Sequence, residues 1–487
     1  MTASNIASLV DATRQSHQYD ASVDGLLKNV YINALNNTTF HSTPLMEMFG
    51  DFGGTIDFAG NQIIKAFKHQ GAGGFGGISE GGDFVKGRNQ KGFQGSTRIK
   101  YLNAFFSLTG PAVRTIRTGE GAYVDSVSSA MDDTLRLARQ QMERICGGRG
   151  DGELARYLAV KNNTEGAMVT GEYLPSTDAA SALTYDAAVH TFTALAAAGG
   201  YSTAQWLQPG LRVQICPTSA LDGTVESTEF QGPFEVGHVD YEDGTFSLKY
   251  VGTANLNVTT LSTAANWSLV FENAYGQVET AGTVTADQCL ELNGLYNLVS
   301  DGVDHSGATN GVNETATKYA QIWGLTRSSY PHALKSTVKA ESGTELDEEL
   351  LMRWVLDMVN IKQNTPNVLV TDPLSRLKYF SNRKEDRRFD MKIMDSMFGF
   401  KSIGVVIDQY SLLLQSLTSL TPGTLFMLNT NDFKYAKASN GFEWIEDGGG
   451  VMRNAETKDS MFATAINYCE FVCENPNGQL KATGLAY

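Results

Sequence analysis

The chain has 487 residues, a mass of 52.8 kDa and 42% hydrophobic residues, which excludes a small disulfide-stabilised module and a globally disordered protein. Its 38 basic and 53 acidic residues give a formal charge of −15. Affinity for a polyphosphate comes from clustered lysine and arginine, so this balance excludes a protein whose main task is to grip nucleic acid. We expect any nucleic acid nearby to be enclosed rather than bound.

Residues 1–50 are polar, with apolar clusters too sparse for a core, and are predicted to form an arm that lies against another molecule. Residues 51–110 contain two predicted strands, 55–67 and 97–108, joined by a glycine-rich segment too long for a hairpin turn. From Asn61 to Lys100 there are ten glycines, seven basic and two acidic residues, a charge of +5 that leaves −20 for the rest of the chain.

A long basic hairpin on an acidic body is suited to contact an acidic neighbour, because opposite charges steer the encounter and aromatic residues anchor it. The alternative is a floppy, solvent-exposed loop. The candidate intersubunit contact residues are its basic and aromatic side chains: Lys65, Lys68, Phe75, Phe84, Lys86, Arg88, Lys91, Phe93, Arg98 and Lys100.

The rest of the chain contains both helical and strand patterns, and the fold class that we expect is α+β. Apolar residues spaced by three and four predict a helix with one narrow stripe over 121–146. Residues 209–271 are predicted to form short strands of an inserted, acidic, all-β domain, with a hairpin at 242–244. A helix over 345–361, capped by Thr344, precedes a strand at 367–372 and a helix that starts at Pro373. Short apolar runs at 404–409, 423–429 and 465–475 are predicted to be buried strands.

No catalytic, cofactor or metal site is predicted. The five cysteines (Cys146, Cys216, Cys289, Cys469 and Cys473) are scattered, and the seven histidines occur singly. The glycines of 71–77 lack the following Gly-Lys-Ser/Thr of a phosphate loop, and there is no Gly-x-Ser-x-Gly motif. The first residues do not resemble a signal peptide, and no run approaches the ~20 apolar residues that span a bilayer. We therefore expect a protein made in the cytoplasm that is not an enzyme, has no cofactor and does not contact membranes.

The order of these parts resembles the HK97-fold major capsid proteins of tailed bacteriophages. The arm, the hairpin and the helix 121–146 are similar to the family's N-arm, extended loop and spine helix. Residues 317–338, with Gly324, Arg327 and Pro331, resemble the segment before the axial lobe, and the strands that follow resemble that lobe. The expected division is as follows: arm 1–50, extended loop 51–110, peripheral domain with spine helix 111–200, inserted β domain 201–282, connection and helix 283–365, axial domain 366–462, and closing strands of the peripheral domain 463–487.

The resemblance implies a structural protein of the virion, made in the host cytoplasm, that assembles with itself as hexamers and pentamers. The icosahedral shell would enclose double-stranded DNA and would have portal and scaffolding proteins, with a decoration protein as a further option, as partners. Two alternatives stay open at this point. One is an encapsulin-type nanocompartment shell with the same fold, and the other is a β-rich glycan-binding or hydrolytic protein of a different class.

Overall fold

The structure is a computed structural model, and it describes more of the C-terminal half of the chain than of the N-terminal half. The described residues are 55–57, 62–110, 120–148, 150, 152–158, 167–168, 191–193, 206–217, 224–226, 231–240, 245–252, 256–257, 266–272, 283–285, 289–303, 317–382, 393–395, 401–407, 410–417, 420–437, 442–446, 451–454 and 459–486. The predicted arm, residues 1–50, lies outside them. No helix in these ranges is long and apolar enough to cross a membrane.

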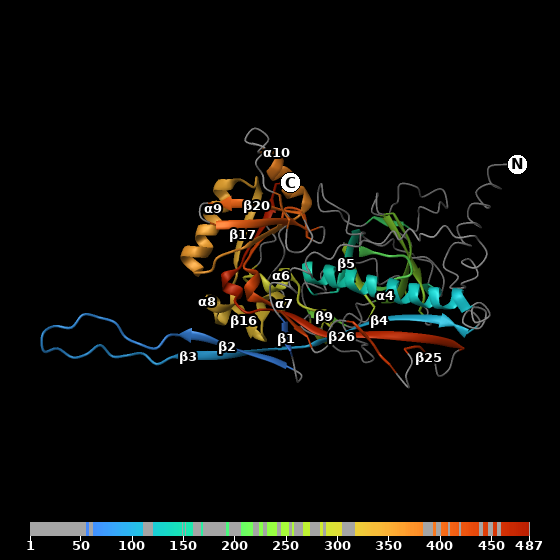
Figure 1. The fold of residues 1–487 in the computed structure, drawn as a ribbon, viewed down its shortest axis with the longest axis horizontal. Coiled ribbons are helices and arrows are strands. Elements are labelled where there is room, and N and C mark those ends of the chain that lie inside the picture. The colour runs from blue at the N-terminus through green and yellow to red at the C-terminus, as the bar shows by residue number, and fades with distance from the viewer. Residues whose placement is uncertain are drawn as a thin grey trace.

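A long two-stranded hairpin projects from one end of the body (Figure 1). Its strands are β2 (Gln62–Gln70) and β3 (Lys91–Arg98), which pair antiparallel from Gln62 opposite Arg98 to Gln70 opposite Lys91. After Ile99 the chain continues into β4 (Lys100–Thr109), which belongs to the body. A hairpin is therefore present, but its strands differ from the expected ones. The predicted strand 97–108 belongs mostly to β4, which pairs with β26 in the body, and β2 pairs instead with residues 91–98, which were expected to lie mostly in the glycine-rich segment.

The body contains a six-stranded sheet centred on β26 (Ser460–Cys473), which pairs with β4 along ten residues of each strand. The other strands of this sheet are β1 (Thr55–Asp57), β23 (Phe433–Lys437), β24 (Glu443–Trp444) and β25 (Arg453–Asn454). The long helix α4 (Glu120–Gly147), which confirms the helix predicted over 121–146, runs along β4 and β26 in Figure 1.

The last two turns of α4 differ from the expected single narrow stripe. Residues 140–147 are all buried, including the polar side chains of Gln140, Gln141, Glu143 and Arg144. The sheet covers one side of these turns, and the segment after residue 289 covers another, so the helix ends inside the protein. An internal helix end needs polar partners for its charged residues, and Arg144 donates to the backbone oxygen of Glu153 and pairs with Glu291.

The predicted β-rich region forms a six-stranded sheet with its own core, here called the β module. Its strands, in spatial order, are β5 (Glu153–Leu158), β13 (Asn266–Phe271), β8 (Arg212–Pro217), β10 (Gln231–Asp240), β11 (Thr245–Tyr250) and β7 (Thr191–Thr193). The antiparallel pairing of β10 with β11 confirms the predicted hairpin. Because β5 and β7 precede residue 201, the module extends beyond the expected range of 201–282. Two small pairs accompany it, β6 (Ala167–Met168) with β12 (Leu256–Asn257) and β9 (Thr224–Glu226) with β14 (Thr283–Thr285).

The third part is a mixed seven-stranded sheet with helices on one face. Its strands, in spatial order, are β17 (Thr337–Thr344), β27 (Leu480–Leu485), β22 (Leu425–Leu428), β18 (Val368–Thr371), β21 (Tyr410–Ser416), β20 (Lys401–Ile407) and β19 (Ile393–Asp395). Helices α9 (Glu348–Leu356) and α10 (Pro373–Asn382) pack on one face, and the other face joins the main core. The expected cap of α9 was wrong: Asp347, not Thr344, accepts a hydrogen bond from the first helical N–H.

This sheet divides the C-terminal region differently from the expected domains. It begins at β17, inside the expected connection, and includes β27, which was expected among the closing strands of the peripheral domain. Conversely, β23, β24 and β25 fall in the expected axial domain but pair in the sheet of β26. A few short elements join the two sheets: α6 (Leu295–Leu298), α7 (Thr317–Ala320), β15 (Gln321–Ile322), β16 (Leu325–Thr326), α8 (Pro331–Leu334) and the 3₁₀ turns Arg327–Ser329, Thr430–Asp432 and Pro476–Gly478.

Candidate functional site

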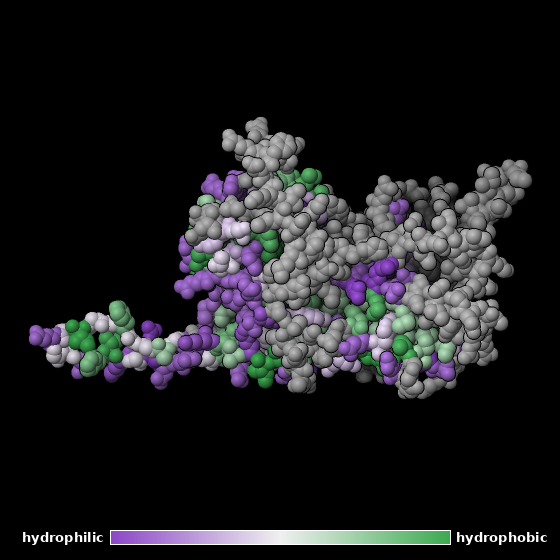
Figure 2. All heavy atoms as spheres, viewed as in Figure 1, coloured by the Kyte–Doolittle hydropathy of each residue, from purple (hydrophilic) through white to green (hydrophobic). Residues whose placement is uncertain are grey.

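The hairpin tip, residues 71–90, is the candidate functional surface. Every one of these residues is exposed, and Phe75 and Phe84 are 103% and 87% exposed. Ile78 and Val85 are also large, apolar and exposed, so four such side chains gather on one thin loop (Figure 2). Exposed apolar clusters of this kind mark surfaces that become covered by another molecule.

The glycines of the tip allow its two sides to approach closely. A Cβ atom on Gly74 would lie 2.7 Å from the backbone oxygen of Lys86, and one on Gly76 would lie 2.8 Å from the side chain of Val85. Gly73 and Arg88 exchange backbone hydrogen bonds, and Gly81 has a φ of +78° at the far turn. Without Cβ atoms at these positions the tip is a narrow ribbon with its two phenylalanines presented to solvent.

The root of the hairpin, in contrast, is fixed to the body by an aromatic cluster. Phe93 stacks on Phe67 at 5.2 Å between ring centroids and on Tyr330 at 3.9 Å, and Trp323 meets Phe67 edge-on. The backbone N–H of Ser96 donates to the oxygen of Trp323 at 2.9 Å. These contacts attach β2 and β3 to the body at the root, and the tip projects away from the body (Figure 1).

The structure separates the ten predicted contact residues into two groups. Three of them contact their own chain: Lys65 forms an ion pair with Glu474, Phe93 stacks in the root, and Lys100 donates to the backbone oxygen of Cys289. The other seven are exposed: Lys68, Phe75, Phe84, Lys86, Arg88, Lys91 and Arg98. The tip itself is neutral, because Lys86 and Arg88 are balanced by Glu80 and Asp83. The positive charge therefore lies on the stem, and the tip is distinguished by its apolar residues.

Sequence reasoning missed Ile78 and Val85 at the tip and Trp323 and Tyr330 at the root. The two tip residues could have been found, because they are large apolar residues in a glycine-rich segment. Trp323 and Tyr330 gave no local signal, since they lie more than two hundred residues from the strands that they hold.

The close contact of Gly95 with Trp323 predicts that Gly95→Ala loosens the hairpin root. A Cβ atom there would lie 2.6 Å from Cβ of Trp323 and 3.0 Å from its backbone oxygen, so the strand must shift, at a cost of about 1–3 kcal/mol. We expect faster hydrogen exchange of the amides of residues 91–98. Gly77→Ala is the matched control because nothing lies within 4 Å of its added Cβ atom. Equal hydrogen-exchange rates of these amides in the two variants would show that the close contact of Gly95 with Trp323 does not stabilise the hairpin root.

A buried carboxyl group lies beneath the root. Glu470 of β26 is fully buried, and its Oε1 accepts hydrogen bonds from the backbone N–H groups of Asn293 and Phe471 at 2.9 and 3.0 Å. Its Oε2 has no hydrogen-bond partner. Burial raises the pKa of Glu470 to about 7, although the nearby Lys100 ammonium and the two N–H groups oppose the shift. The junction of hairpin, sheet and the 289–293 segment thus contains a group that titrates near neutral pH.

All five cysteines are buried and form no disulfide. Burial raises the pKa of Cys469 to about 12 and that of Cys146 well above its ordinary value. The thiols of Cys146 and Cys469 therefore stay protonated at neutral pH, which suits packing and not nucleophilic chemistry. Among the described residues, no group of three or more His, Cys, Asp or Glu is placed to hold a metal ion.

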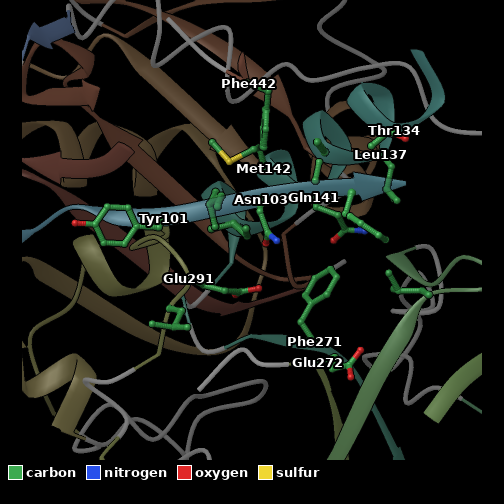
Figure 3. Close-up of a pocket in the computed structure, with 17 residues that line it drawn as sticks. Tyr101, Asn103, Thr134, Leu137, Gln141, Met142, Phe271, Glu272, Glu291 and Phe442 are labelled. Carbon is green, nitrogen blue, oxygen red and sulfur yellow. The ribbon is translucent and has the colours of Figure 1, made fainter. Parts of the chain in front are cut away.

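A groove of about 380 Å³ lies between α4, β4 and the β module (Figure 3). Leu137 and Met142 of α4 and Phe271 of β13 contribute apolar surface, and Asn103 and Gln141 contribute polar groups. Behind them the buried ion pair of Arg144 with Glu291 joins α4 to the segment after the module, and Arg144 also lies over the ring of Phe271. The buried ion pair therefore supports one wall of the groove, and the lining includes apolar side chains.

Comparisons with known proteins find similarity at the level of structure. No protein-family model matches the sequence, and no curated protein matches it. The cyanophage A-1(L) capsid asymmetric unit contains a chain with 10% identity and a TM-score of 0.47, over 95% of this chain and 98% of that chain. A structure from Mycobacterium phage Ogopogo has 9% identity and a TM-score of 0.38, over 95% and 98%. The capsid of cyanophage P-SCSP1u has 8% identity and a TM-score of 0.37, over 95% and 94%.

Proposed function

We propose that this chain is the major structural subunit of an icosahedral shell of the HK97 type. It assembles with itself as hexamers and pentamers and encloses double-stranded DNA, as part of a virion. Portal and scaffolding proteins, and a decoration protein, are the further partners that this function includes. The observation that carries the proposal is the tip of residues 71–90, which is fully exposed, apolar and held at a distance from its own body.

A loop of this kind is unfavourable for an isolated subunit, because its apolar side chains gain nothing from folding. It becomes favourable when adjacent copies cover it. Contact of a projecting hairpin with a neighbour adds interface area without enlarging the body, and a shell of many copies multiplies each such contact. Stability then resides partly in the assembly, since a partner that binds only the folded subunit adds to its apparent stability.

The charge balance fits the proposed contents. A formal charge of −15 on each subunit disfavours tight adhesion of DNA to the wall, because phosphate affinity requires clustered basic residues. A shell of this charge encloses DNA without fixing it. The same fold around an enzyme cargo would give shells of similar shape, and co-purified nucleic acid or protein distinguishes the two contents.

Removal of the tip tests the proposal. We expect the full chain to form shells or capsomers that are visible by negative-stain electron microscopy and elute early in size exclusion. Replacing residues 71–90 with an Asn-Gly turn keeps β2, β3 and the aromatic root, so the subunit should fold with an unchanged unfolding midpoint. It should yield no stable shells. Small particles from the unaltered chain, or normal shells from the deletion, would refute the proposed function or the role of the tip, respectively.

A further inference from the structure

The segment 289–293, here called the strap, is tied at both ends to the junction of β4 and β26. At its start, the backbone oxygen of Cys289 accepts a hydrogen bond from the ammonium group of Lys100, the first residue of β4. At its end, the backbone N–H of Asn293 donates to Oε1 of Glu470 at 2.9 Å. The two ends of the strap therefore depend on one ammonium group and one carboxyl group.

The centre of the strap is held by a different set of contacts. Glu291 forms a buried ion pair with Arg144 of α4, and its Oε2 accepts a hydrogen bond from the backbone N–H of Gly152 at 2.8 Å. Gly294, the residue after the strap, has no room for a Cβ atom against the backbone at the end of α4. These contacts fix the centre, so a change at Glu470 acts on the ends of the strap.

One oxygen of the Glu470 carboxyl group has no hydrogen-bond partner. The side chain is completely buried, and Oε1 accepts two backbone N–H groups, but Oε2 accepts none. A buried carboxyl group in this state can hold a proton, whereas its ionised form needs a donor or a cation for each oxygen. The ammonium group of Lys100 already interacts electrostatically with Glu470. Its flexible four-carbon stem allows it to change partners without a movement of the backbone.

We propose that the strap is a pH-sensitive latch, in which Lys100 changes its partner from the backbone oxygen of Cys289 to Oε2 of Glu470 when that carboxyl group releases its proton to solvent. A hydrogen bond between ammonium and carboxylate is charge-assisted on both sides, and is stronger than one to a neutral carbonyl group. The bond from Asn293 is kept, and the start of the strap is released. This inference concerns the single subunit and does not depend on the proposed shell.

The groups around Glu470 place this change near neutral pH. Burial raises the pKa of Glu470 to about 7, and Lys100 opposes the shift. Burial also raises the pKa of the two nearby thiols, so they stay protonated when Glu470 titrates. The surrounding titratable and charged groups are Lys100 of β4, Cys146 of α4 with its neighbour Glu143, Glu291 of the strap with its partner Arg144, and Cys469 of β26.

Thiol labelling of the full chain tests the latch, because Cys289 lies at the end that is released and is only 3% exposed. Cys216 of β8 is also buried and lies outside the strap, so the ratio of Cys289 to Cys216 labelling corrects for the general rise of thiol reactivity with pH. We expect this ratio, measured by mass spectrometry of alkylated peptides, to rise about tenfold between about pH 6 and about pH 8.5, because the closed state loses one hydrogen bond to a charged group.

Four variants identify the groups that control the latch. Glu470→Gln is uncharged at every pH and should keep the labelling ratio low throughout, whereas Glu446→Gln, at an exposed position, is its matched control and should follow the unaltered chain. Lys100→Met removes the bond to Cys289 and should give a high ratio at both pH values. Lys65→Met, which removes another basic residue of the hairpin that contacts its own chain, is the control for Lys100→Met and should not.

Three results would overturn the latch. They are a ratio that does not change with pH in the unaltered chain, an equal rise in Glu470→Gln, and a low ratio at both pH values in Lys100→Met. The infrared band of the protonated carboxyl group, compared between the unaltered chain and Glu470→Gln, shows separately whether Glu470 titrates in this range. Titration of Glu470 without a change in the labelling ratio would reject the exchange of partners by Lys100.

Discussion

Replacing Arg327 with methionine should lower the free energy of unfolding by about 3 kcal/mol. The guanidinium group is completely buried, and it donates to the backbone oxygens of Tyr319, Leu334 and Asn297. These three acceptors belong to α7, α8 and α6, so one side chain joins three short helices that lack the length to be stable alone. Methionine fills much of the same volume but leaves the three buried carbonyl groups without this donor.

Denaturant unfolding of the full chain measures this loss. Arg353→Met is the matched control, because Arg353 is 65% exposed and pairs with Glu349 one helical turn away, which is worth about 0.5 kcal/mol or less. Arg327→Lys should fall between the two, since an ammonium group cannot reach three carbonyls in the fork geometry of a guanidinium. If Arg327→Met lowers the free energy of unfolding no more than the control does, Arg327 does not stabilise the packing of α6, α7 and α8.

Local sequence patterns predicted several helices and strands, because the residues that determine where these elements form are close in sequence. The three- and four-residue spacing of 121–146 specified α4, and Pro373 after a buried strand specified the start of α10. The hairpin could also be predicted, because its strands flank a segment with too many glycines to pack. These features depend on neighbours within one or two turns of chain.

The assignment of strands to sheets could not be predicted in the same way. β26 and β27 are separated by only a few residues, yet β26 centres one sheet and β27 lies inside the other. Both segments are apolar and strand-like, so nothing in their residues states which partner each will pair with. That choice is made by complementarity with strands distant in sequence, such as β4 for β26 and β17 for β27. Pairing of the same kind brought β5 and β7 into the β module.

In the candidate site, too, the features that depend on nearby residues could be predicted, and those that depend on residues distant in sequence could not. The exposed rings of Phe75 and Phe84 follow from their glycine-rich surroundings and were predicted. The contacts of Lys65 and Lys100 within their own chain depend on partners from the C-terminal half, so their positive charge alone suggested an intersubunit role. Glu470 was missed because alternation along β26 places it on the face opposite to that of Cys469 and Phe471, and its burial depends on distant segments such as 289–293.

Glu470→Gln should remove a dependence of stability on pH that the unaltered protein shows. Burial raises the pKa of Glu470 from its ordinary 4.5 to about 7 in the folded chain. Between these values the folded state binds a proton that the unfolded state has released, so the stabilisation is complete below pH 4.5 and is lost as pH rises through about 7. Each pH unit corresponds to about 1.4 kcal/mol, so the full effect is about 3 kcal/mol.

The isoelectric point near 5.0 limits measurements at low pH, because a protein without net charge tends to precipitate. From about pH 5.5 to about pH 8.5 we expect the unaltered chain to lose about 2 kcal/mol of stability relative to Glu470→Gln. Glu446→Gln, at an exposed position, is the matched control and should follow the unaltered chain. Parallel curves for Glu470→Gln and the unaltered chain would mean that folding does not change the pKa of Glu470.

A second variant identifies which neighbour sets the midpoint of this titration. The groups that interact with Glu470 are Lys100 at the hairpin root, the thiols of Cys146 and Cys469, and the backbone N–H groups of Asn293 and Phe471. Among them only the ammonium of Lys100 is charged at neutral pH, and it favours the ionised carboxyl. Lys100→Met should therefore raise the pKa of Glu470 further and move the loss of stability to higher pH, whereas an unchanged midpoint would show that the two N–H groups alone hold the charge.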